Sequence, residues 1–147
     1  MSSDFLTSFC HWASQEKIEL SSEILHEARL SYIDTIACIE AGKNQVISTK
    51  IETFNNQYFH HSVPASRAMQ YACQAGILDY DDYESAGSSH PSAPIISAVL
   101  ALAPQLNLRL TDILEAWVVG YEIIIRMGEA LGYGHYEKGW HATSTYG

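Results

Sequence analysis

Residues 90–104 read HPSAPIISAVLALAP, and this stretch decides the fold. Within it, residues 92–103 carry apolar side chains nearly all round a helix. Such a helix has no natural water-facing side, so neighbours must cover it on every side. We therefore expect residues 92–103 at the centre of a helical core.

Helical patterns lie on both sides of this central segment. Apolar residues recur at helical spacing in each of them, and capping residues open several. The predicted helices are residues 5–13 behind a Ser3-Asp4 cap, 21–42 ending at Gly42, a weak helix in 43–61, 62–76 with Pro64 in its first turn, and a long helix from a Thr111-Asp112 cap onward. The predicted fold class is all-α, a helical bundle-like arrangement of antiparallel neighbours, because no stretch alternates with a period of two.

Composition narrows the classes of function. The chain has 147 residues, a length that suits one domain, and 47% of them are hydrophobic. The net charge of −9 and the lack of any Lys or Arg cluster argue against nucleic acid as a partner. The most apolar stretch, residues 113–125, contains Glu115 and Glu122 and is too short to span a bilayer, so no membrane partner is expected.

Cysteine usage bears on the compartment. The three cysteines are Cys10, Cys38 and Cys73, which are widely spaced and set among apolar residues. This pattern suits reduced core thiols better than disulfides or metal ligands. We expect a cytoplasmic protein.

An acidic stretch next to the central helix has two open interpretations. In LDYDDYESAGSSHPS, residues 78–92, Asp79, Asp81 and Asp82 lie close enough to repel, which raises at least one pKa and suits acid/base work or a hard cation. A solvated acidic turn is the plainer alternative. His90 stands where a helix begins and free N–H groups favour a carboxylate, although Ser92 would equally serve as a plain N-cap.

Two further segments carry polar chemistry. His60 and His61 have no third ligand at metal spacing nearby, so we predict no metal site there. Residues 134–147, GHYEKGWHATSTYG, contain His135 and His141 among hydroxyl and glycine residues. An ordinary loop is the plainer interpretation of that segment. No nucleophile elbow, Walker loop or dinucleotide fingerprint is present.

Three ordered blocks taken together resemble a known family. LDYDDYESAGSSHPSAPIISAVLALA, ILEAWVVGYEIIIRMGEALG and GWHATSTYG are similar to the N-terminal helical part of the MmgE/PrpD family. That family includes 2-methylcitrate dehydratase, cis-aconitate decarboxylase and iminodisuccinate epimerase. The resemblance implies a lyase or isomerase that moves a proton next to a carboxylate of a small polycarboxylate, with no cofactor and no metal. GHYEKGWHATST looks most like the epimerase-type members.

The resemblance also suggests residue roles. By position, Asp79, His90 and His141 match the family's catalytic aspartate and histidines. We place Asp82, Ser92, Thr143 and Ser144 with the substrate-binding residues. Three positions depart from the family pattern, namely Tyr83 in place of threonine, Gly76 in place of histidine and Ala142 in place of proline.

The resemblance covers a helical domain and not the whole length of such enzymes. Their active-site lysines and a second, α+β domain lie beyond the region matched here. We therefore expect residues 1–147 to be a single, incomplete domain of a truncated or split form with little activity alone, which forms a homo-oligomer or is completed by a C-terminal polypeptide. The alternatives are a non-catalytic helical interaction or oligomerisation module, and a non-functional product of a shortened gene.

Overall fold

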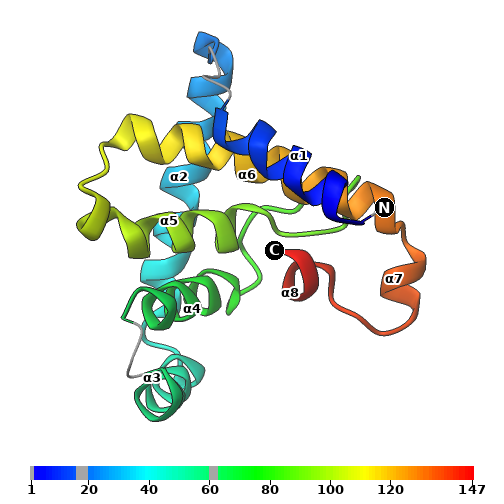
Figure 1. The fold of residues 1–147 in the computed structure, drawn as a ribbon. Coiled ribbons are helices and arrows are strands. Elements are labelled where there is room, and N and C mark those ends of the chain that lie inside the picture. Colours follow the sequence, from blue (N-terminus) through cyan, green and yellow to red (C-terminus); the bar gives the residue numbers. More distant parts are fainter. Residues whose placement is uncertain (1, 16–19, 60–62) are drawn as a thin grey trace.

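The predicted fold class is confirmed. A computed structural model describes residues 2–15, 20–59 and 63–147, and every regular element within those ranges is a helix (Figure 1). The helices are α1 (Ser2–Gln15), α2 (Ser22–Gly42), α3 (Val46–Tyr58), α4 (Val63–Gly76), α5 (Ser92–Leu106), α6 (Leu110–Leu131), α7 (Gly134–Glu137) and α8 (Ala142–Tyr146). His60 and His61, for which no metal site was predicted, lie outside the described residues.

Helix α5 lies at the centre, as its composition predicts. It packs against α4, α6 and α2, and it contributes to both clusters of buried apolar side chains. Ile96 joins a cluster with Leu114 and Trp117 of α6, while Ala93 joins a second cluster with Ala75 of α4. The α5 helix therefore links the two halves of the core.

The expectation that α5 is covered on every side was wrong. Leu102 is 40% exposed and Leu106 is 60% exposed, although Ile96 and Ala101 on the same helix are buried. The neighbours α2, α4 and α6 cover one broad side of α5 and its N-terminal half. Among the described residues, the C-terminal half of α5 thus keeps an apolar side open to solvent.

The predicted start of α2 agrees with the structure, and there a side chain caps the helix. The Ser21 hydroxyl oxygen accepts a hydrogen bond from the Ile24 N–H at 3.3 Å, which confirms the predicted start of α2. The other two predicted caps were placed too late, because α1 begins at Ser2 and α6 begins at Leu110. In α6, Asp112 lies inside the first turn and its carboxylate accepts the Arg109 N–H at 2.8 Å.

The weak helix predicted in residues 43–61 forms as α3. It packs on α4, and this tertiary contact stabilises a segment whose flanking polar residues favour a loop. Gly42 is the last residue of α2, as predicted, but the position requires glycine because of helix packing and not because the helix ends there. A Cβ atom at Gly42 would overlap the carbonyl oxygen of Gln74, so the glycine lets α2 approach α4 closely.

The prediction that the three cysteines lie in the core is confirmed only in part. Cys38 is buried and Cys73 is half-buried, and burial raises the pKa of both thiols. Cys10 is exposed on α1, so the prediction of a core position was wrong there. Within the described ranges, no helix has both the length and the apolarity that crossing a membrane would require.

The C-terminal segment is more ordered than the loop predicted for it. It forms the short helices α7 and α8, and Figure 1 shows α8 returning to the middle of the molecule. The Tyr146 hydroxyl donates to the carbonyl oxygen of Gly87, 59 residues earlier, and Ala142 is buried. This contact brings residues 141–147 against the loop between α4 and α5.

Candidate functional site

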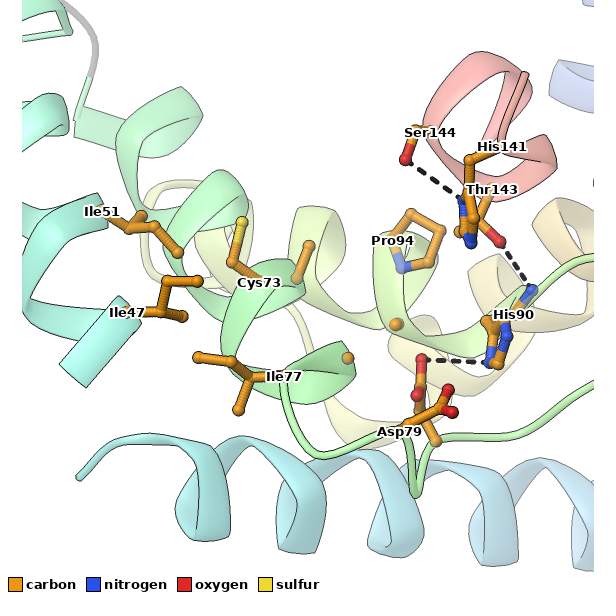
Figure 2. A pocket seen from close by; sticks show the side chains of 14 residues that line it. Ile47, Ile51, Cys73, Ile77, Asp79, His90, Pro94, His141, Thr143 and Ser144 are labelled. Carbon is orange, nitrogen blue, oxygen red and sulfur yellow. Dashed lines mark hydrogen bonds and ion pairs between the residues drawn. The ribbon is translucent and has the colours of Figure 1, made fainter. Parts of the chain in front are cut away.

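A cavity of about 420 Å³ opens between α3, α4, the loop 77–91 and α8. Figure 2 shows apolar side chains such as Ile47, Ile51 and Ile77 on one side and the polar groups on the other. The polar lining residues are Asp79, Asp81, His90, His141, Thr143 and Ser144. The structure thus brings five of the seven predicted site residues to one cavity.

His90 is held from several directions. Its backbone N–H donates to the Thr143 hydroxyl oxygen at 2.8 Å, across 53 residues of sequence. Its ring lies nearly parallel to that of His141, at 15° with ring centroids 6.3 Å apart, and Tyr83 meets it edge-on at 5.6 Å. The loop before α5 and helix α8 therefore place two imidazoles side by side.

Asp81 is the partner of His90 that the predicted site residues did not include. Its Oδ2 atom lies 3.5 Å from His90 Nδ1, within ion-pair distance, and its side chain is only 5% exposed. Burial raises the pKa of Asp81, while the charge of His90 opposes that shift. The only sequence signal for this role is the acidic run itself, which cannot tell which carboxylate turns inward.

Asp79 differs from Asp81 in its exposure to solvent. Its backbone lies in the left-handed region at φ 57°, which directs this exposed carboxylate into the cavity mouth. Asp79, Asp81 and His90 each offer an atom within 4.8 Å of the others, close enough for a divalent cation to contact all three. The acidic run is therefore not a uniformly solvated turn.

His141 precedes α8 and is exposed to the cavity. Its Nδ1 lies 3.3 Å from the Ser144 hydroxyl oxygen, one turn along the chain (Figure 2). Thr143 turns its hydroxyl toward the backbone of His90 instead. These two hydroxyl residues hold the two histidines, Ser144 through the His141 ring and Thr143 through the His90 backbone.

Asp82 and Ser92 lie behind the cavity and bind each other. The Ser92 N–H donates to Asp82 Oδ1 at 3.1 Å, and the Ser92 hydroxyl donates to Asp82 Oδ2. The same hydroxyl oxygen accepts from Trp117 Nε1 at 2.8 Å. The N-cap position of α5 is Pro91, so Ser92 is the first residue of the helix and not its cap, and the Asp82 carboxylate satisfies the free N–H of Ser92.

The raised pKa values in the acidic run have a different main cause from the one predicted. Burial is the largest contribution to the raised pKa of both Asp81 and Asp82. Repulsion from the charges of Asp82 and Asp79 adds less to the raised pKa of Asp81. The direction of the prediction was right and the reason was incomplete.

Charge at the cavity is unbalanced for an anionic ligand. Among the described residues that line it, none is a lysine or an arginine. Two carboxylates, Asp79 and Asp81, face two imidazoles, His90 and His141. The described lining therefore supplies carboxylates and imidazoles and no guanidinium or ammonium group.

Comparison with known proteins gives one match. The sequence profile described as MmgE/PrpD N-terminal domain matches residues 7–147. A search of curated proteins and a search of solved structures found nothing that matches.

Proposed function

Because the chain belongs to the MmgE/PrpD family, matched through the family's N-terminal domain over residues 7–147, we propose that its cavity carries acid/base chemistry on a small polycarboxylate. The reaction is of the lyase or isomerase type, in which a proton leaves or joins a carbon next to a carboxylate. Dehydration as in 2-methylcitrate dehydratase and epimerisation as in iminodisuccinate epimerase are both reactions of this kind.

One observation carries the proposal. Asp79, His90 and His141 come from two segments about 50 residues apart in sequence and line the same cavity. Two nearly parallel imidazoles and a carboxylate are side chains of the kind that accept and donate protons in acid/base catalysis. Asp79, His90 and His141 all contact the substrate from the polar side of the cavity in this proposal.

The lack of Lys and Arg in the described lining defines what the site needs in addition. A polycarboxylate must be held by cationic groups, and stabilisation of developing negative charge is often the largest contribution to catalysis. We propose that residues of a second copy or of a complementing polypeptide supply that charge. The chain alone then binds weakly and turns over slowly.

Binding tests the proposal first. Titration with 2-methylcitrate or cis-aconitate should shift the ring signals of His90 and His141 in ¹⁵N-edited NMR spectra. His135 serves as an internal control, because it is in the same C-terminal segment and outside the cavity lining. Equal shifts of all three histidines would indicate nonspecific binding and argue against the site.

Proton transfer is then measured directly. In D₂O, ¹H NMR should show slow exchange of the substrate protons next to a carboxylate, and His141→Gln should slow this by about 100-fold or more. His135→Gln should leave the rate unchanged. No exchange at high protein concentration, with or without a candidate complementing polypeptide, would contradict the proposal.

A second candidate function is a helical oligomerisation module. It is favoured by the apolar side chains exposed on α2 and α3, including Ile33 at 63% and Val46 at 76%. Sedimentation equilibrium decides whether the chain self-associates, and Ile33→Glu should then weaken the association. A strictly monomeric chain at high concentration would rule this function out.

A further inference from the structure

We propose that Asp81 is a positioning residue for His90, whose buried carboxylate holds the ring in the tautomer with the proton on Nδ1. This inference rests on the proposed function, since it deepens the role of His90 at the same site. It assigns a role to a carboxylate that touches the ring from behind and is almost closed to solvent.

The contact between the two side chains carries the proposal. Asp81 Oδ2 lies 3.5 Å from His90 Nδ1, and the Asp81 side chain is 5% exposed while the His90 side chain is 21% exposed. His90 Nδ1 is buried and has no hydrogen-bond partner among the described residues, and the same is true of Asp81 Oδ1. The buried Nδ1 thus faces Oδ2 of a carboxylate whose other oxygen, Oδ1, is also buried.

While Asp81 is ionised, only one neutral tautomer of His90 makes this arrangement favourable. A carboxylate offers only acceptors when ionised, so a bare Nδ1 lone pair would place two acceptors in contact without water. With the proton on Nδ1, the ring donates to Asp81 Oδ2 and the buried nitrogen gains a partner. Such hydrogen bonds are often long in ligand-free structures and shorten when the ligand binds.

Other groups around His90 limit how the ring can turn. Thr143 holds its backbone N–H, His141 stacks on one face and Tyr83 meets the edge. The following residue is Pro91, which restricts the backbone of His90 to extended conformations. Ring rotation away from Asp81 is therefore opposed on several sides.

Neighbouring carboxylates do not compete for this role. Asp82 is occupied by the N–H and hydroxyl groups of Ser92. Asp79 is exposed at the mouth of the cavity. Asp81 is thus the buried carboxylate in this loop with capacity left for His90.

The consequence concerns the other ring nitrogen. Because Nδ1 is buried, the exposed part of the ring belongs to its opposite side, where Nε2 lies. In a neutral imidazole one nitrogen donates and the other accepts, and the bond made by the first sets the role of the second. A proton fixed on Nδ1 leaves Nε2 as the proton acceptor.

The tautomer can be observed without turnover. Long-range ¹H–¹⁵N correlation spectra of ¹⁵N-histidine-labelled chain, recorded with EDTA at a pH where His90 is neutral, should show Nδ1–H and a bare Nε2. A predominance of Nε2–H in the unmodified chain would overturn the proposal. So would an Nδ1–H form that appears only after a divalent cation such as Zn²⁺ is added.

Matched variants identify the carboxylate that is responsible. Asp81→Asn should convert His90 to a mixture of tautomers, and Asp81→Glu should restore part of the Nδ1–H form. Asp79→Asn is the control, because asparagine tolerates the left-handed backbone at that position and removes a nearby charge. Equal loss of the Nδ1–H form in both Asn variants would overturn the proposal. If Asp81→Asn does not fold, the tautomer measured in the unmodified chain tests the proposal instead.

Exchange kinetics separate this inference from the proposed function. In D₂O, Asp81→Asn should lower the exchange rate at saturating substrate by about 100-fold and leave the half-saturating concentration nearly unchanged. An Nδ1–H tautomer with no exchange in the unmodified chain would refute the proposed function alone. Exchange with an Nε2–H tautomer would refute the positioning role alone.

Discussion

At the scale of single residues, two buried serines on α5 have opposite surroundings. The Ser92 hydroxyl joins Asp82 to Trp117, whereas the Ser97 hydroxyl is buried and has no hydrogen-bond partner among the described residues. Both side chains are about equally buried. Comparing the two serines therefore shows how much a bridging hydroxyl adds to the free energy of unfolding and how much an unpartnered buried hydroxyl subtracts from it.

We predict that Ser92→Ala lowers the free energy of unfolding by about 2 to 4 kcal/mol, because it leaves a buried carboxylate and an indole N–H each short of a partner. Ser97→Ala should change it by no more than about 1 kcal/mol, and in the stabilising direction. Urea unfolding followed by circular dichroism measures both. Equal losses in the two variants would mean that the Asp82–Ser92–Trp117 contacts add no stability.

Asp82 gives a prediction about pH. Burial raises its pKa above the ordinary value of 3.8, so between these two values the folded state holds the proton more tightly than the unfolded state. The free energy of unfolding then falls as pH rises through this window, and the loss is complete above the raised pKa. Asp82→Asn should flatten that fall when unfolding is compared between about pH 4 and pH 7.

Asp112 is a control of opposite sign. The Arg109 guanidinium beside it lowers the pKa of Asp112, so its contribution is present above the ordinary value and is lost as pH falls through the lowered one. Asp112→Asn should therefore remove stability at neutral pH and not at low pH. If both variants change the pH profile in the same direction, burial does not dominate at Asp82.

At this scale the sequence predicts which residues belong to the site better than it predicts which side chains they contact. The predicted residues Asp79, His90 and His141 do line one cavity, because each follows or precedes a helix end that tertiary packing brings there. Asp82 and Ser92 do not line it, and Asp81 does. A run of four residues cannot show which side chains turn inward, since that depends on where Ser92 offers its N–H and hydroxyl to Asp82 and where the His90 ring meets Asp81.

At the scale of helices, the 3.6-residue pattern predicts which segments are helical and predicts their ends less well. The α5 segment is central as expected, and α3 is helical although its polar flanks favour a loop. The short α7 and α8 could not be predicted, because they have too few residues for any period. The close approach of α2 to α4 at Gly42 also could not be predicted, because the sequence does not show which helix packs against Gly42.

Gly42 makes that last point testable. We predict that Gly42→Ala costs about 3 kcal/mol of unfolding free energy, because the new methyl group would overlap the backbone of Gln74 and separate α2 from α4. Gly134→Ala is the matched control, since a Cβ there meets nothing within 4 Å, and it should stay within about 0.5 kcal/mol. Similar unfolding midpoints for the two variants would contradict the close packing of α2 and α4.

At the scale of the whole molecule, the two core clusters share α5. Leu100 packs against both clusters, so neither can be exposed without disturbing the other. We predict a single cooperative unfolding transition in urea, with far- and near-ultraviolet circular dichroism coinciding. A near-ultraviolet signal lost well before the helical signal would show that this part of the family's domain lacks fixed packing.

The hydrogen bond between Thr143 and the backbone of His90 also bears on the order in which parts of the chain fold. It joins residues 53 apart, and closing so long a segment is slow compared with forming a helix. On the ribosome, the loop that holds His90 is made well before residue 143 and stays without His141 for that interval. The polar side of the cavity is therefore completed after the helices around it.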